Sequence, residues 1–337
     1  MRLLRHLLLT VIVAALLLGA AVAWWLQRPL PLPPKADGTP APLVHVEPGS
    51  SARRVAQTLV DAGVQTPPWL LEAWFRLSGQ ATVIQAGYYE LEPGLTPRTL
   101  LDRLVRGEQA LISLTLVEGW NHREVLQALR RSPWLTQDLD GLSMAEVMAR
   151  IGYPGQHPEG RFFPDTYRVV RGAPASSVLR QAAQAMEQRL AEAWRQRAPS
   201  AAVTTPEQAL ILASIVEKET GRDSDRQQVA GVFNNRLRMG MRLQTDPTVI
   251  YGLGERFDGN LRKVDLQTDT PYNTYTRAGL PPTPIAMPGW ASLWAAVQPA
   301  PTSALYFVAR GDGSSQFSAT LNEHNAAVRR YQLQQRP

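Results

Sequence analysis

The stretch TTPEQALILASIVEKETG, Thr204–Gly221, predicts a single helix with a marked start and end. Thr205 is a favourable N-cap, and Pro206 suits the first helical position. Gln208 would complete a T-x-x-Q capping box, and Gly221 predicts a left-handed stop after the last turn. Local chemistry alone therefore assigns these residues to one helix.

This helix is predicted to be buried on every face, because residues 209–216 are apolar apart from Ser214. Glu217 and Glu219 follow, about 200° apart around a helix, so they cannot both face one pocket. Glu217 continues the stripe that contains Ser214. A partly buried carboxyl there would favour the protonated form that general acid catalysis needs. A salt bridge from either glutamate to an arginine is the alternative.

The composition is that of a globular protein. The chain has 337 residues, 44% of them hydrophobic and 19% charged, which suggests two or three domains. A net charge of +6 suits membrane headgroups or an anionic polymer, but no block of five Lys or Arg predicts nucleic-acid binding. Cysteine is absent, which excludes disulfides and thiolate sites. No metal or cofactor is predicted, because the histidines are scattered: His6, His45, His122, His157 and His324.

The N-terminus predicts a membrane anchor. Basic residues within 1–6 precede an apolar run over 7–26 that is long enough to span a bilayer, with Trp24 and Trp25 at its far end. We expect a cytoplasmic N-terminus, a single-pass helix in the inner membrane and a periplasmic remainder. A cleaved signal peptide is the alternative, since Ala21–Ala23 offers a cleavage site. The apolar run continues beyond that site, which favours the anchor.

Residues 27–42 are rich in proline and predict an extended linker. A weak repeat follows within 43–150: a strand, a glycine turn and an amphipathic helix occur three times, aligned on Gly49, Gly94 and Gly119. The strands are expected at 43–46, 87–91 and 111–117. The first unit resembles a LysM-like module, a small fold that binds N-acetylglucosamine polymers.

The C-terminal part adds a predicted loop over 157–172, an amphipathic helix over 175–197, and a helix from 228 to about 239 that Gly240 stops before a further loop. Amide, hydroxyl and tyrosine side chains gather after the glutamate helix, and these groups suit carbohydrate recognition. They are Asn234, Asn235, Gln244, Thr245, Tyr251, Tyr272, Asn273, Thr274 and Tyr275, and the carboxylate of Asp246 lies among them in the sequence.

Five strings taken together resemble the endolytic murein transglycosylase (YceG-like) family: LASIVEKETG, VFNNRL, MRLQTDPTVIYG, YNTYTRAGLPPTPI and FPDTY. The resemblance runs from about Leu43 to Tyr331. It implies an α+β protein with one N-terminal transmembrane helix. After that helix the resemblance implies a LysM-like subdomain over 43–150. It also implies an α+β catalytic domain over 151–337, built around the glutamate helix.

The resemblance also implies an activity. Such an enzyme cleaves the MurNAc–GlcNAc β-1,4 bond within peptidoglycan glycan strands, and its catalytic glutamate corresponds to Glu217. Glu217 would protonate the glycosidic oxygen and then deprotonate the C6 hydroxyl of N-acetylmuramic acid, which leaves a 1,6-anhydro end without a cofactor. The expected partners are nascent glycan strands, the inner membrane and glycan-polymerising synthases (penicillin-binding proteins), with a role in limiting strand length.

The remaining candidate residues are assigned to substrate binding, and two of them have a second interpretation. Substrate binding is predicted for Asn235, Gln244, Thr245, Asp246, Tyr251, Tyr272, Asn273, Tyr275 and Glu219. Glu219 could instead orient a loop, and Asp246 could be a turn cap or a second carboxylate. Two other functions stay open: a muramidase that hydrolyses the same bond, with Asp246 opposite Glu217, and a non-catalytic wall-binding protein.

Overall fold

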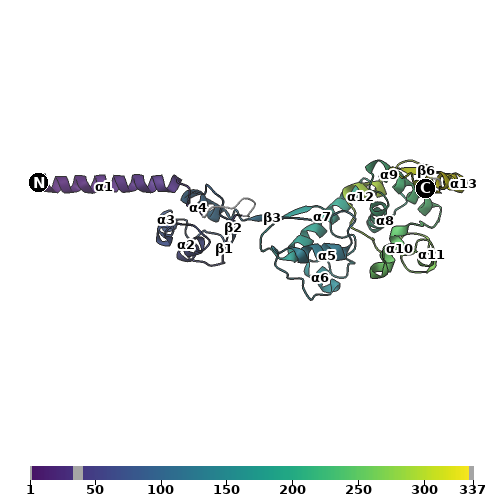
Figure 1. The fold of residues 1–337 in the computed structure, drawn as a ribbon, viewed down its shortest axis with the longest axis horizontal. Coiled ribbons are helices and arrows are strands. Elements are labelled where there is room, and N and C mark those ends of the chain that lie inside the picture. Colours follow the sequence, from purple (N-terminus) through teal and green to yellow (C-terminus); the bar gives the residue numbers. More distant parts are fainter. Residues whose placement is uncertain (1, 33–40, 334–337) are drawn as a thin grey trace. The chain divides into compact units, whose positions relative to one another are not determined.

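The computed structural model describes residues 2–32 and 41–333, and the chain forms two compact units (Figure 1). Unit 1 extends to Ile112 and includes Val170–Gly172; unit 2 holds Ser113–Val169 and the chain from Ala173 onward. Strands β3 (Leu111–Thr115) and β4 (Thr166–Val170), paired in one small sheet, carry the chain from one unit to the other. Residues 113–150 therefore pack with the C-terminal part. Because the units are defined by packing alone, the functional boundary at residue 150 stays a prediction.

Unit 1 is a small α+β domain. Its elements after the N-terminal helix are β1 (Leu43–Val46), α2 (Ala52–Asp61), α3 (Pro68–Leu77), β2 (Gly87–Glu90) and α4 (Pro97–Arg106). β1 pairs with β2 in antiparallel register, with Leu43 opposite Glu90 and Val46 opposite Gly87. The helices cover this sheet through a core that includes Val55, Leu59, Leu71, Phe75, Tyr89, Leu100 and Leu104.

The repeat predicted from the sequence is confirmed in its local structure. Gly49, Gly94 and Gly119 adopt φ of 77°, 92° and 78°, a left-handed conformation that glycine adopts readily. Each is followed by a helix of ten residues: α2, α4 and α5 (His122–Arg131). The three copies do not form one domain, since α5 belongs to unit 2.

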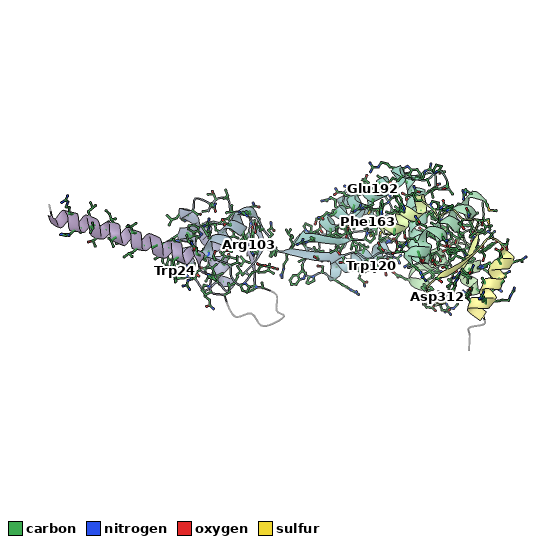
Figure 2. The ribbon with its side chains drawn as sticks, turned by 90° about the horizontal axis from the view of Figure 1, so that it is seen from above. Trp24, Arg103, Trp120, Phe163, Glu192 and Asp312 are labelled. Atoms are coloured by element: carbon green, nitrogen blue, oxygen red, sulfur yellow. The ribbon has the colours of Figure 1, made fainter. Side chains whose placement is uncertain are left out.

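Helix α1 (Arg2–Gln27) exposes apolar side chains along its length (Figure 2); Leu8 is 61% exposed and Leu16 68%. Its length and composition would allow it to cross a membrane, and a signal sequence has the same properties.

The chain that follows α1 is not a free linker. Leu30 is buried and its N–H donates to the Leu95 carbonyl oxygen at 2.7 Å, while the Pro31 carbonyl oxygen accepts from the Gln65 N–H at 2.9 Å. Residues 28–32 thus pack on unit 1, contrary to the predicted extended linker, because Leu30 is apolar and finds a place in the core. Residues 33–40 of that prediction lie outside the described residues.

Unit 2 is organised around α8 (Pro206–Glu219), whose residues 209–216 are all buried, as predicted. The helices α7 (Ala175–Arg195), α9 (Asp223–Arg238) and α12 (Trp290–Val297) pack directly against it. Helix α7 confirms the amphipathic helix predicted over 175–197. Gly240 has φ 66° just beyond α9, which confirms the predicted stop.

Shorter elements complete unit 2. They are α6 (Met144–Arg150), α10 (Asp246–Leu253), η1 (Gly254–Arg256), α11 (Lys263–Gln267), the antiparallel pair β5 (Tyr306–Ala309) and β6 (Ser315–Ser318), α13 (Leu321–Val328) and η2 (Arg329–Leu333). Two loop predictions hold only in part: residues 241–245 and 157–165 form no helix or strand, but α10 begins at Asp246 and β4 occupies Thr166–Val170. Pro247 in the first turn of α10 was the helix signal that the prediction overlooked.

The ends of α8 differ in detail from the prediction. Thr205 caps the start by accepting from the Gln208 N–H at 3.1 Å, but the Gln208 side chain accepts from the Thr204 N–H at 2.7 Å instead of completing the box with Thr205. At the other end Thr220 is extended (φ −143°, ψ 128°), and Gly221 is not left-handed. The chain is extended where it leaves α8, and α9 begins only four residues after Glu219.

We predict that Ser214→Ala lowers the free energy of unfolding by about 1–3 kcal/mol. The fully buried Ser214 hydroxyl accepts from the Ile285 N–H at 3.0 Å and donates to the Ile211 carbonyl oxygen at 2.7 Å. The substitution would leave the Ile285 N–H buried without its partner. Denaturant unfolding measures the change, with the exposed Ser303→Ala as control. Equal midpoints for both variants would contradict this interpretation.

Candidate active site

Glu217 lies in the last turn of α8 with a side chain only 7% exposed. Its Oε2 accepts from the Gly289 N–H at 2.9 Å, and its Oε1 lies 4.0 Å from Nη2 of Arg226. Arg226, on α9, is itself buried. A carboxyl at a helix C-terminus is disfavoured by the helix dipole, and here Gly289, the N-cap of α12, and the guanidinium offset that cost.

Two segments that are distant in the sequence meet beside Glu217. The Gly119 N–H donates to the Met287 carbonyl oxygen at 2.9 Å, and the Met287 N–H donates to the Trp120 carbonyl oxygen at 2.6 Å. Nζ of Lys218 adds a hydrogen bond to the Gly119 carbonyl oxygen at 3.2 Å. A Cβ atom placed on Gly119 would lie 4.0 Å from Cγ of Glu217. The turn that precedes α5 is therefore fixed against the end of α8.

Glu118 is brought to Glu217 by this arrangement, and the sequence analysis missed it. A Cβ atom on Gly289 would lie 1.8 Å from Oε1 of Glu118, so both carboxyls contact the same residue. Burial of its carboxyl against this backbone, and then the charge of Glu217, raise the pKa of Glu118; Arg226 opposes them. The glutamate in VEGW was indistinguishable from the turn glutamates in VEPG and LEPG of the other repeats.

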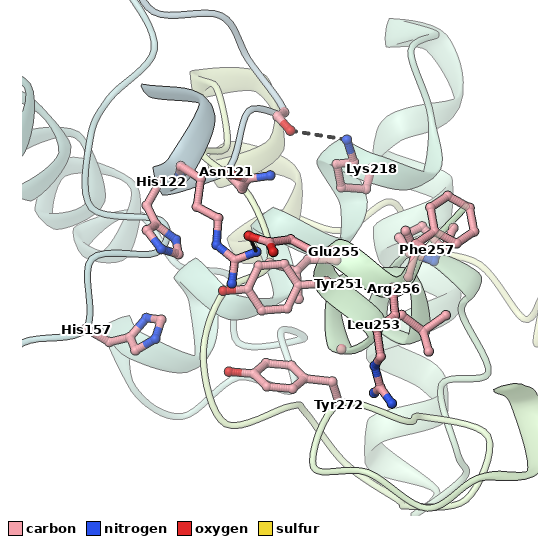
Figure 3. A pocket seen from close by; sticks show the side chains of 17 residues that line it. Asn121, His122, His157, Lys218, Tyr251, Leu253, Glu255, Arg256, Phe257 and Tyr272 are labelled. Carbon is pink, nitrogen blue, oxygen red and sulfur yellow. Dashed lines mark hydrogen bonds and ion pairs between the residues drawn. The ribbon is translucent and has the colours of Figure 1, made fainter. Parts of the chain in front are cut away.

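A cavity of about 1130 Å³ opens next to this centre (Figure 3). Gly119 and Lys218 line one side of it, and Tyr251 and Tyr272 present their rings from another, with ring centroids 5.0 Å apart. Glu217 is not among the lining residues; it lies directly behind Gly119. The cavity has the size and the aromatic lining of a site for an extended ligand.

A buried carboxylate supports the cavity wall. Glu159 is fully buried and accepts from the His122 N–H at 3.1 Å, with its Oε2 2.7 Å from Nδ1 of His122. Burial, and then the charge of Glu159, raise the pKa of Tyr251. Burial, and then the neighbouring His122, lower the pKa of His157, which keeps that ring neutral at pH 7. These contacts could not be predicted from the sequence, because the residues that make them meet only in the folded chain.

Glu219 faces a different set of side chains. Its Oε1 accepts from the Thr245 hydroxyl, and the Thr245 N–H donates to Oγ1 of Thr274 at 3.1 Å. Burial is the main cause of the raised pKa of Glu219; the charge of Asp246 adds to it, whereas Thr245 and Arg236 oppose it.

The other predicted residues on this side are bound within the protein. Asp246 accepts from the Tyr275 hydroxyl at 2.6 Å, which together with burial raises the pKa of that tyrosine. Gln244 has φ 52°, unusual for a residue other than glycine, and its Oε1 accepts from Arg236 at 3.2 Å. None of these three lines the cavity described above.

The side-chain amides of the two asparagines predicted to bind substrate donate to backbone carbonyl oxygens. Nδ2 of Asn235 donates to the carbonyl oxygens of Thr302 and Ala304, both at 2.9 Å. Asn273 is fully buried, and its amide donates to three carbonyl oxygens of the chain around α11, the shortest bond being 2.7 Å to Thr268. Of the predicted binding residues, the cavity thus brings together Tyr251 and Tyr272.

Within the described residues, no group of three or more His, Asp or Glu side chains is arranged to hold a metal ion. The Glu217 carboxyl is instead matched by Arg226 and by the Gly289 N–H.

The sequence profile of the YceG-like family matches residues 44–330, which covers both units. The chain belongs to the YceG-like family. A YceG-like protein of Listeria monocytogenes, solved in the crystal at 2.6 Å, superimposes with a TM-score of 0.54 at 29% identity, over 84% of this chain and 97% of that one.

Two relatives with names extend the comparison. An endolytic murein transglycosylase of Bacillus subtilis is 30% identical over 323 residues, covering 89% of this chain and 87% of that protein. One from Streptococcus pneumoniae serotype 2 is 26% identical over 333 residues, and there this chain spans 59% of the relative's length.

We predict that Glu219→Gln flattens the pH dependence of stability. A raised carboxyl pKa means that the folded state binds the proton more tightly. The wild type therefore loses stability as pH rises from about 4.5, the ordinary glutamate value, through the raised value. The amide variant lacks this loss. Unfolding midpoints measured from pH 4 to pH 8 test the prediction, and parallel curves for the two proteins would refute it.

Proposed function

We propose that this protein is a lytic transglycosylase that cleaves peptidoglycan glycan strands internally, with Glu217 as its catalytic residue. The observation that carries the proposal is the placement of Glu217: its nearly buried carboxyl lies in the last turn of α8, next to the buried residues 209–216 and directly behind Gly119 in the cavity wall. The names of the relatives from Bacillus subtilis and Streptococcus pneumoniae support the reaction and the substrate.

The reaction needs a proton at the start and a proton acceptor later. Glu217 would protonate the glycosidic oxygen as the MurNAc–GlcNAc bond breaks, and its carboxylate would then take the proton from the C6 hydroxyl of N-acetylmuramic acid. That oxygen bonds to C1 and closes the 1,6-anhydro ring. Neither water nor a second nucleophile enters the products. The low exposure of Glu217 is consistent with this chemistry, because it limits access of competing water.

The cavity would hold the glycan strand. The rings of Tyr251 and Tyr272 offer apolar faces for sugar rings, and Nζ of Lys218 stands at the side nearest to Glu217. Because the buried Glu159 holds the backbone and the ring of His122, this part of the wall is ordered before a ligand enters. The direct roles in substrate binding proposed for Asn235, Gln244, Thr245, Asp246, Asn273, Tyr275 and Glu219 would then require a longer binding surface than this cavity.

A muramidase that hydrolyses the same bond is the second candidate. Asp246 is poorly suited to oppose Glu217, because it lies with Tyr275 and Glu219. Glu118 is the carboxyl next to Glu217, and such a pair is what a hydrolase would use. The products separate the two reactions.

Helix α1 and unit 1 bear on where the protein is located in the cell. We propose that α1 anchors the chain in the inner membrane with unit 2 in the periplasm, where nascent strands and their synthases act. The order β1–α2–α3–β2 and its antiparallel pairing support a LysM-like role for part of unit 1. Packing of residues 28–32 on unit 1 would keep that domain close to the bilayer.

We predict that Glu217→Gln lowers the rate of strand cleavage by about 10²–10⁴-fold, the usual contribution of a general acid–base group. Mass spectrometry of digested sacculi is expected to find 1,6-anhydro ends with the wild type, one water lighter than reducing ends. The exposed Glu192→Gln on α7 is the matched control and should digest normally. Undiminished cleavage by the Glu217 variant would overturn the assignment, whereas reducing ends alone would identify a muramidase.

We predict that the full-length protein stays in the membrane fraction and keeps its first residues. Carbonate extraction and N-terminal sequencing measure this, because α1 as an anchor resists extraction. A mature chain that begins at Trp24 would instead identify residues 1–23 as a signal peptide.

A further inference from the structure

We propose that Glu118 and Glu217 form a carboxyl pair that carries one proton between them, so that Glu118 positions the proton that Glu217 delivers. This inference rests on the proposed transglycosylase function and adds a second residue to it.

The geometry brings the two groups together at Gly289. Glu217 accepts from the Gly289 N–H at 2.9 Å, and Oε1 of Glu118 lies where a Cβ atom of residue 289 would be. The backbone that presents Glu118 is held by the hydrogen bonds of Gly119 and Trp120 to Met287. The backbone position of Glu118 is therefore set by these hydrogen bonds.

The surroundings of the pair divide the proton unevenly. Glu217 has a backbone donor and Arg226 beside it, and both favour a carboxylate. Glu118 is partly desolvated against Gly289, and burial and the charge of Glu217 raise its pKa. The raised pKa of Glu118 therefore favours the proton on the Glu118 side of the pair.

Few other charges face the pair. Glu217 and Lys218 come from α8, and Lys218 is held by the Gly119 carbonyl oxygen. Asp223 and Arg226 come from α9, where they pair with each other. The 287–289 segment contributes no titratable side chain. The net result is one excess negative charge close to two carboxyls, which retains a proton.

The proton count closes over one turnover. The pair starts with one proton, gives it through Glu217 to the leaving oxygen, and receives one from the C6 hydroxyl of N-acetylmuramic acid. The C1–O bond to the leaving sugar breaks and the C1–O6 bond forms, so the pair ends as it began. Glu118 is more exposed than Glu217 and can also exchange the proton with solvent.

The test compares pH profiles of kcat/KM on glycan strands for the full-length protein. In Glu118→Gln the remaining carboxyl has lost its negative neighbour, so the alkaline limb should move down by roughly one pH unit, with a rate loss of about 10- to 100-fold at neutral pH. Glu118→Asp should recover part of the rate. Glu192→Gln again controls for the loss of one surface charge.

Gly289→Ala is an independent variant that keeps both carboxyls. Its methyl group would take the place of Oε1 of Glu118, while the residue 289 N–H remains for Glu217. Since Gly289 is extended (φ −76°, ψ 175°), alanine fits its backbone. The alkaline limb should shift as it does in Glu118→Gln.

Carbon-13 NMR of glutamate-labelled protein gives a readout without turnover: Glu118 should titrate above the ordinary glutamate range, and Glu217→Gln should move that titration down. Unchanged alkaline limbs in both Glu118→Gln and Gly289→Ala, or a Glu118 titration that ignores Glu217→Gln, would overturn the pair. If Glu217→Gln itself remains active, the proposed function fails instead.

Discussion

The hydrogen bond from the Gly289 N–H to Glu217 links two segments of the candidate active site. It joins the last turn of α8 to the N-cap residue of α12, and these two helices pack directly on one another in unit 2. Because residues 209–216 are buried on all sides, α8 can neither rotate nor slide without opening the core. The direction of Glu217 is therefore fixed by packing that lies well away from the carboxyl itself.

This constraint explains why the two glutamates of one helix turn have separate surroundings. Glu219 points to Thr245 and the N-terminal end of α10, whereas Glu217 points to Gly289 and Arg226. Their separation around the helix follows from α-helical geometry alone. Burial raises the pKa of Glu219, and the protein supplies a hydroxyl rather than a close cation as its direct partner. Glu219 thus belongs to the support of the loop between α9 and α10.

Sequence patterns predicted the features of the structure that depend on residues close together in the chain. The burial of α8, the extent of α7 and the glycine turns of the repeat all follow from periodicity and backbone preference. The active-site surroundings depend instead on distant segments: 171 residues separate Glu118 from Gly289 in numbering (289 − 118). The amides of Asn235 and Asn273 show the same limit. Their composition suits a sugar, but the fold directs them to backbone carbonyls.

Gly119 and Gly289 require glycine for two different physical reasons. Gly119 has φ 78°, so its backbone conformation favours glycine, and a Cβ there would make only ordinary contacts. Gly289 is extended, a conformation open to any residue, yet a Cβ would collide with Glu118. The absent side chain at 289 thus makes room for a carboxyl, not for a turn. Space of this kind beside Glu217 allows two acidic side chains to approach the same residue, Gly289, and it is the physical basis for treating them as one unit.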